Sequence, residues 1–290
     1  MTHEARIIKE LLTRDAGTEG SLLIQKKIYD TLIAPPLRER IGRGQAAFII
    51  GPDSIPGSSV DVDLSTPLTM KVNRIAEGGA VPIKVVDFTS FNMKPKKYGV
   101  RPLVTKEMQE DAKWDLILHN IGQAGLEMGY NEDKIILSDA LDNANSNNAV
   151  SVTGALGVQN INEAKKNLRE NDYKPTKMFV GPKVAMDLEN IDTYVEADKL
   201  GDRSTFINGL VGRVPGMDVI LFSPNVAPSS TYTNYAYVFD PRFAYCMADK
   251  RPLTIERYDD VTHDLSGVVV TQRFTTHIVR DLAIAKITTT

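Results

Sequence analysis

The sequence contains a single cysteine, Cys246, and no long hydrophobic run. One cysteine excludes an internal disulfide and a cysteine-based zinc site, and it fits a reducing compartment. No stretch approaches the ~18 consecutive apolar residues that a membrane helix needs, so we expect no membrane partner. Residues 1–15 are charged throughout and lack the hydrophobic segment of a secretory signal.

The chain also lacks a strong excess of either charge. It has 34 lysine and arginine residues against 37 aspartate and glutamate residues, which gives a net charge of -3. This balance argues against a protein that coats nucleic acid through bulk electrostatic attraction. With 42% hydrophobic and 24% charged residues, the composition is that of an ordinary globular protein, and 290 residues suffice for one large domain or two smaller ones.

Catalytic motifs are absent as well. None of the four histidines belongs to a His-Glu-x-x-His metal motif, and there is no Gly-x-Ser-x-Gly elbow or phosphate-binding loop. The glycine-rich run 209–216 has the wrong spacing for a dinucleotide site, and Pro215 breaks any helix that would hold a phosphate there. We therefore expect no catalytic residue and no cofactor.

The best metal candidate is the acidic run Asp259-Asp260-Val-Thr-His263-Asp264. Carboxylates and an imidazole this close together are ligands that a divalent ion accepts. The same residues suit a solvated polar loop between two strands. We favour the loop and expect no metal site, because the sequence shows no further cluster of ligands.

Two other sets of reactive residues have structural explanations. Glu107, Glu110 and Asp111 are candidates for acid–base chemistry, but they begin a predicted helix, where acidic side chains suit the positive end of the dipole. Cys246 lies in an apolar run, which favours a buried, inert thiol over a nucleophile.

The first hundred residues have little apolar surface of their own. Residues 1–60 are predicted to form an irregular arm with short helices at 4–14 and 22–33, and Pro35-Pro36 stops the second helix. From Val60 to Gly99 the chain is extended in character, and Gly78-Gly79 marks the tip of a long two-stranded hairpin. A lone hairpin is marginally stable in water, so we expect a neighbouring subunit to cover it.

A long helix is predicted from Trp114 to about residue 140, and Thr105 caps the segment before it. A line of glycines along the helix is tolerable where another backbone packs closely. A single apolar stripe of this length favours packing against a sheet. The stripe is interrupted only at Asn131 and consists of Trp114, Ile117, Ile121, Ala124, Met128 and Ile135, and the glycine line runs through Gly122, Gly125 and Gly129.

After a polar linker at 142–148, helices and strands alternate as in a compact α/β subdomain over about 150–248. Its predicted elements are helices at 160–171 and 182–188 and strands at 177–180, 217–222 and 235–239. Three more strands follow at 253–258, 268–279 and 282–287. These strands need an apolar cover, and the long helix is the obvious candidate.

Four runs of residues carry a resemblance to a known family. They are Asp249 to Arg257, the terminal run through Arg273 and Arg280 to Ile287, Val104 to Asp111 at the start of the long helix, and Gly212 to Val219 followed by Ser223 to Pro228. Their order along essentially the whole chain resembles the major capsid protein of tailed bacteriophages and related archaeal viruses, which has the Hong Kong 97 fold.

The resemblance implies an α+β fold in four parts. Residues 1–60 would form an N-terminal arm, and residues 61–100 an extended β-hairpin loop that lies on a neighbouring subunit. Residues 101–148 and 249–290 would form a peripheral domain with a long spine helix and long antiparallel strands. Residues 149–248 would form an axial α/β domain around the five-fold or six-fold axis of a capsomer.

The function implied is structural rather than enzymatic. Copies would self-assemble into pentamers and hexamers of an icosahedral shell, the virion capsid, assembled in the host cytoplasm around double-stranded DNA that is held by non-specific contact. Portal and decoration proteins are further implied partners. The sequence gives no sign of a removed N-terminal scaffolding segment, so a separate scaffolding protein is an expected partner too.

Two lysine groups bear on these contacts. The basic cluster Lys94, Lys96, Lys97 and Arg101 suits DNA, an acidic neighbour or solvent equally well. Some family members join subunits through lysine–asparagine bonds. The loop lysines at 71 and 84 have no marked asparagine or glutamate partner, so we expect no such crosslink.

Two alternatives remain open at this point. An encapsulin has the same fold and encloses a cargo enzyme instead of a genome, but encapsulins typically begin with a helical N-terminus rather than an irregular arm. A metal-dependent intracellular enzyme would be centred on Asp259, Asp260, His263 and Asp264.

Overall fold

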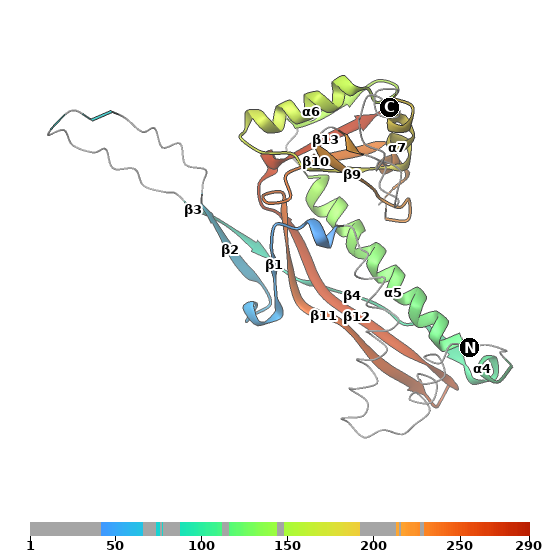
Figure 1. The fold of residues 1–290 in the computed structure, drawn as a ribbon. Helices are drawn as coiled ribbons and strands as arrows, with labels where there is room; N and C mark the ends of the chain where they lie inside the picture. The colour runs from blue at the N-terminus through green and yellow to red at the C-terminus, as the bar shows by residue number, and fades with distance from the viewer. Residues whose placement is uncertain are drawn as a thin grey trace.

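The structure is a computed structural model, and it describes residues 42–65, 74–75, 77, 88–111, 116–143, 148–191, 213–214, 216–226 and 229–290. The helices predicted at 4–14 and 22–33 and the hairpin tip at Gly78-Gly79 lie outside these residues. The described strands form a five-stranded sheet, a six-stranded sheet and a two-stranded hairpin, with helices on both larger sheets (Figure 1). The predicted α+β class is confirmed.

The five-stranded sheet is built on one long antiparallel pair, β11 (Tyr245–Asp260) and β12 (Leu265–Ile278). Strand β1 (Ile49–Ile50) pairs with β11, while β4 (Lys96–Val100) and β5 (Leu103–Thr105) pair with β12. The strand predicted at 253–258 begins eight residues earlier. Its register shifts between Arg251 and Thr254, which accommodates Pro252, a residue that cannot donate to the ladder.

The long helix lies against this sheet, as predicted (Figure 1). Helix α4 (Lys106–Asp111) precedes α5 (Leu116–Ile135), and a π-helical turn η4 (Ile136–Leu141) extends it. The predicted stripe is confirmed for its side chains in the described residues: Ile121, Ala124, Met128 and Ile135 are buried. Near the end of the stripe, Asn131 is half-buried and the charged Glu132 is fully buried instead.

The three glycines of α5 differ in their surroundings. Gly125 and Gly129 are buried, but Gly122 is half-buried, and a Cβ added there would meet no described atom within 4 Å beyond its chain neighbours and the adjacent backbone of its own helix. Close backbone packing therefore does not explain Gly122.

Replacing Gly122 by alanine is expected to raise the free energy of unfolding by about 1 kcal/mol, because alanine restricts the unfolded chain more and favours the helix. Chemical denaturation of the unassembled protein measures the change. Gly267→Ala is the opposing control, since its Cβ would collide with the Pro102 carbonyl oxygen and must destabilise. A loss of stability in the Gly122→Ala protein would contradict the prediction.

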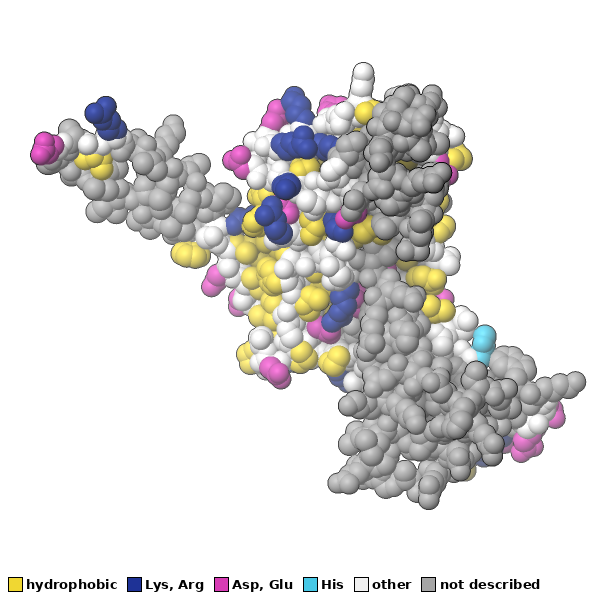
Figure 2. All heavy atoms as spheres, in the orientation of Figure 1, with side chains coloured by type: hydrophobic (Ala, Val, Ile, Leu, Met, Phe, Trp, Pro, Cys, Tyr) yellow, Lys and Arg dark blue, Asp and Glu magenta, His cyan; other side chains and the backbone are white. Residues whose placement is uncertain are grey.

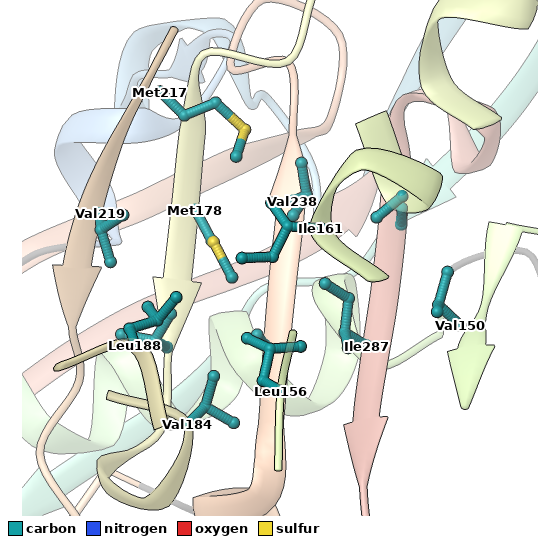
Figure 3. Close-up of a cluster of buried hydrophobic side chains, with 14 of the residues drawn as sticks. Val150, Leu156, Ile161, Met178, Val184, Leu188, Met217, Val219, Val238 and Ile287 are labelled. Atoms are coloured by element: carbon teal, nitrogen blue, oxygen red, sulfur yellow. The ribbon is translucent and has the colours of Figure 1, made fainter. Parts of the chain in front are cut away.

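The six-stranded sheet runs in the order β6 (Val150–Val152), β13 (Ile284–Thr289), β10 (Tyr235–Phe239), β7 (Lys177–Val180), β9 (Met217–Leu221) and β8 (Arg213–Val214). Helices α6 (Val158–Glu170) and α7 (Pro182–Glu189) cover one face. Figure 3 shows the core beneath them, in which Ile161 of α6 and Val184 and Leu188 of α7 lie against the strands. We name the sheet with these two helices the capped unit.

Four elements of the capped unit, α7, β7, β9 and β10, match the sequence-based prediction within a residue, whereas β13 begins two residues later than predicted and β6 and β8 were not predicted. Helix α6 is an exception at its start, because it begins at Val158 rather than after Asn160. The Asn160 side-chain oxygen accepts a hydrogen bond at 3.1 Å from the Gly157 backbone N–H, so Asn160 supports the cap from inside the first turn.

Three segments pair with a sheet that lies outside their predicted part of the chain. The last strand, β13, was expected with the peripheral residues 249–290, but it lies between β6 and β10 of the capped unit. Residues 49–50 of the predicted arm and 96–100 of the predicted loop pair with the five-stranded sheet. Local patterns identify strands, whereas the choice of partner depends on long-range packing.

A second core joins the capped unit to the long sheet. Its residues come from the end of α5, from η4 and from both larger sheets, and Phe239 of β10 and Tyr245 of β11 are fully buried in it. The described ends of the predicted polar linker are held at this junction. Asp142 accepts hydrogen bonds from Tyr232 and Tyr237, and Asn148 is buried and donates to the Leu282 carbonyl.

The two-stranded hairpin consists of β2 (Val60–Ser65) and β3 (Phe88–Met93), paired antiparallel, and it projects from the body (Figure 1). Short 3-10 turns complete the described structure. They are η2 (Arg43–Gln45), η3 (Pro52–Ser54), η7 (Ser230–Asn234) and η8 (Asp281–Ala283). No helix in the described residues is long and apolar enough to cross a membrane.

Candidate assembly surfaces

The end of the N-terminal segment is fixed to the long sheet by a buried polar group. The Arg43 guanidinium lies 2.5 Å from Asp249 Oδ2 and 3.5 Å from Glu132 Oε1, and both carboxylates are buried. The Gly42 N–H donates to Asp133 Oδ1 at 2.9 Å. We name Gly42, Arg43, Glu132, Asp133 and Asp249 the arm anchor.

Two further side chains form hydrogen bonds with the arm anchor. Gln272 donates to Glu132 Oε2 at 3.0 Å, and the Tyr245 hydroxyl donates to the Gly42 carbonyl at 2.5 Å. Burial disfavours the Arg43 charge, but Glu132 and Asp249 outweigh this and raise the pKa of the guanidinium above its ordinary value. The anchor therefore ties one point of the N-terminal segment to α5, β11 and β12 together.

Sequence reasoning missed the arm anchor. One signal was available, because Glu132 falls one turn after Met128 on the buried stripe of α5. A carboxylate at a buried helical position requires a partner. Nothing in the sequence identifies that partner as Arg43, which is 89 residues away.

The root of the hairpin packs on the face of the long sheet opposite α5. Val60 and Val62 of β2 and Phe91 and Met93 of β3 belong to a small core with Cys246 and Ala248 of β11. Phe91 also stacks on the His277 ring, with centroids 4.3 Å apart. Within the part of the chain that the structure describes, the hydrophobic base of the hairpin therefore lies at its root.

Large hydrophobic side chains are exposed at several edges of the described structure. Val261 at the turn between β11 and β12 is 86% exposed, and Phe88 at the far end of β3 is 69% exposed. Figure 2 shows hydrophobic atoms gathered around β1 and the hairpin root, where Phe48 and Ile49 are partly exposed. A gathering of exposed hydrophobic side chains such as the one around β1 is typical of a surface that a partner covers, whereas single exposed residues are common on any protein.

The run 259–264 forms the turn between β11 and β12, and its side chains pair separately. Asp264 contacts Lys106 at 2.5 Å, and Asp259 contacts Arg257 at 2.8 Å. His263 Nδ1 lies 2.8 Å from Asp260, and this hydrogen bond holds the pKa of the Asp260 carboxyl below its usual range. No group of three or more potential metal-ligating residues comes together in the part of the chain that the structure describes.

The other acidic candidates lie on α4. Glu107, Glu110 and Asp111 are exposed, and the Thr105 hydroxyl accepts a hydrogen bond at 3.2 Å from the Met108 N–H. The predicted cap is therefore present, and the acidic residues lie within the short helix that it begins.

The predicted basic cluster separates into different surroundings. The Arg101 guanidinium lies over the Tyr258 ring, 4.8 Å from its centroid. Lys94 and Lys96 are exposed, and Lys97 lies directly across the strand pair from Arg273. The loop lysines at 71 and 84 lie outside the described residues.

Cys246 is fully buried, and its sulfur lies 3.7 Å from the Met93 sulfur. Burial raises the pKa of the thiol to about 12. The thiol of the unfolded chain ionises at about pH 8.5. Below that pH the buried thiol makes its full contribution to the free energy of unfolding, and this contribution is lost as the pH rises from there to about 12.

The folded protein is expected to react with a disulfide reagent at pH 8 at least ~100-fold more slowly than the guanidinium-unfolded protein, since only the thiolate attacks and the native thiol is also inaccessible. The colour change of the reagent measures both rates. Equal rates in the two states would show that the thiol is exposed and contradict its assignment as inert.

The chain matches one family model and many solved structures. A family model described as phage capsid protein matches residues 89–287, which is more than half of the chain. No curated protein matches the chain.

Several solved structures share the fold. One titled for Mycobacterium phage Che8 matches with a TM-score of 0.64 and 16% identity, over 87% of this chain and 90% of that one. The mature capsid of bacteriophage PhiM1 matches with a TM-score of 0.63 and 14% identity, over 87% of both chains. The capsid of a native GTA particle matches with a TM-score of 0.60 and 14% identity, over 86% and 89%.

Proposed function

The chain belongs to the phage capsid protein family and is a structural protein that self-assembles into a shell; we propose that this shell consists of pentamers and hexamers around double-stranded DNA. A single observation carries the proposal: the hairpin β2–β3 projects from the body, and among the described residues its hydrophobic base lies only at its root. A hairpin is marginally stable alone. A neighbouring copy of the chain would supply the rest of its packing.

The two larger sheets are proposed to occupy different positions in the shell. The long sheet with α5 would form the peripheral part of each subunit, and the capped unit, including β13, would surround the five-fold or six-fold axis. Residues before about 60 would act as an arm, and the arm anchor supports this by fixing the end of that segment to the long sheet. The loop around the hairpin would lie on a neighbour.

The remaining partners are proposed from the same family membership. DNA would be held by non-specific contact, which suits a chain with a net charge of -3. Scaffolding, portal and decoration proteins would take part in assembly in the host cytoplasm. An encapsulin that encloses a cargo enzyme is not favoured, because the matching family model is that of phage capsid proteins.

Electron microscopy of the purified protein tests the proposal. Closed shells, or rings of five and six, are expected, and a monodisperse monomer at high concentration would overturn it. Nuclease-protected DNA in native particles would support a genome-enclosing shell, and a protein cargo in its place would contradict that part.

Substituting Asp260 and His263 by alanine tests the metal-dependent enzyme against the shell. The double variant is expected to assemble like the original protein, because the two side chains bond to each other, to the backbone of their own turn and to the nearby Tyr258 hydroxyl of the same subunit. Metal binding by the original protein that the variant loses would contradict a purely structural role.

A further inference from the structure

Three cationic residues stand side by side on the long sheet. Arg273 of β12 lies directly opposite Lys97 of β4 on one side and Arg251 of β11 on the other. We name Lys97, Arg251 and Arg273 the basic row. Like charges that face each other across strands repel and destabilise the sheet. An anion beside the row would remove this cost.

The basic row lies on the same face of the sheet as the hairpin root. Arg273 and His277 are four residues apart on β12, so they share a face, and His277 stacks on Phe91 of β3. Phe274, which points the other way, is buried in the core with the end of α5. The row therefore faces away from the long helix.

The row borders a hollow of about 410 Å³ that is lined by Pro95, Lys97, Lys250, Arg251 and Arg273. Four of these five side chains are cationic. Within the described residues they contact only neutral oxygens: Arg251 donates to the Thr271 hydroxyl, Arg273 to the Pro95 carbonyl and Lys250 to the Ile55 carbonyl.

The charge of the row has no counterpart in the described part of its own subunit. No carboxylate of those residues lies within 4 Å of any of the four cationic groups. The Nε of Arg251 is buried and has no hydrogen-bond acceptor among them. Buried donors are normally paired, so this site is suited to an acceptor from outside the subunit.

We propose that the basic row binds the carboxylates of Asp61 and Asp63 on β2 of a second copy of this chain. The proposal rests on the proposed function, because it requires copies to meet in a shell. Asp61 and Asp63 alternate with Val60 and Val62, and the valines pack on their own subunit. Both carboxylates are therefore exposed on the opposite face of the hairpin.

The spacing of the two groups is compatible. Two residues along a strand place the Asp61 and Asp63 side chains about 7 Å apart, while three adjacent strands make the row about 10 Å wide. Asp61 accepts a hydrogen bond from Asn92, and no cation of the described residues pairs with either aspartate. By contrast, Asp259, Asp260 and Asp264 already pair with Arg257, His263 and Lys106.

Charge reversal and charge exchange test this contact. One variant carries Arg251→Glu and Arg273→Glu, a second carries Asp61→Lys and Asp63→Lys, and a third carries all four changes. Each of the first two is expected to lower the yield of closed shells about tenfold or more, because like charges then meet at the interface. The third is expected to restore most of the yield. Sedimentation and electron microscopy measure the yield.

Lys96→Glu is the matched control, because Lys96 lies on the same strand as Lys97 but on its opposite face. It is expected to leave the shell yield unchanged. Circular dichroism and the thermal midpoint of the unassembled variants establish that each one folds, so that a lost shell reports a lost contact.

Three results would overturn the inference. The row variant could assemble like the original protein, or the exchange variant could fold and still fail to recover shells. A row variant that forms normal shells but loses packaged DNA would identify a phosphate site instead. Failure of the original protein to form any shell would be a separate result, which counts against the proposed function itself.

Discussion

Replacing Phe239 by alanine is expected to lower the free energy of unfolding by about 3–5 kcal/mol. Phe239 is fully buried, and its ring lies edge-on to Phe179 at 4.9 Å between centroids and 6.1 Å from Tyr245. Alanine would remove most of these contacts and leave a cavity in a packed core. Chemical denaturation of the unassembled protein measures the loss, and Phe239→Leu, which keeps more of the volume, is expected to lose less than ~1.5 kcal/mol.

The same substitution should disturb assembly more than its cost in stability explains. Phe239 belongs to the six-stranded sheet and Tyr245 to the five-stranded sheet, so their contact fixes one unit against the other. Leu168→Ala is the matched control, because Leu168 is equally buried in the other core, beneath α6, and is expected to cost about 2–5 kcal/mol.

At equal stability, the Phe239→Ala protein is expected to form fewer closed shells than the Leu168→Ala protein, as counted by electron microscopy. Closure requires the subunits to meet at defined angles, which a loosened junction between the two sheets would blur. Equal shell yields from the two variants would show that the junction core contributes stability alone.

The long helix shows what the sequence could predict. Its apolar residues recur at helical spacing, and those whose side chains the structure describes, from Ile121 to Ile135, form the buried face against the sheet. Hairpin strand β2 and helix α7 were predicted for similar local reasons, from alternation and from Pro182 at a first helical position. These features depend on neighbours in the chain, which the sequence displays directly.

Pairing between distant segments could not be predicted in this way. β13 has the alternation of any buried strand, and only packing against β10 and β6 places it in the capped unit. The basic row could not be predicted for the same reason. Lys97, Arg251 and Arg273 are far apart in the sequence, and the register of three strands brings them together. A cluster built from Lys94, Lys96, Lys97 and Arg101 was predicted because these residues are close in the chain.

The arm anchor provides the second large effect. Arg43→Ala is expected to lower the free energy of unfolding by about 3 kcal/mol, because it removes the guanidinium that pairs with two buried carboxylates. Glu132 is fully buried and Asp249 is 4% exposed, but the Arg43 side chain is 29% exposed. Because solvent screens the exposed part of the guanidinium, we expect a loss of stability at the lower end of the range for buried ion pairs. Arg43→Lys keeps the charge but cannot contact both carboxylates as the guanidinium does, and its loss of stability is expected to be smaller than that of Arg43→Ala.

Hydrogen exchange at two backbone amides distinguishes release of the anchor from general destabilisation. The Gly42 amide donates to Asp133 inside the anchor, whereas the Ala47 amide donates at 2.8 Å to the Tyr245 carbonyl on β11. In Arg43→Ala, the Gly42 amide is expected to exchange much faster than in the original protein, while Ala47 changes only as far as global stability falls. Equal acceleration at both amides would mean that Arg43 stabilises the whole fold and does not specifically hold the N-terminal segment, and the structural basis for treating that segment as an anchored arm would then be lost.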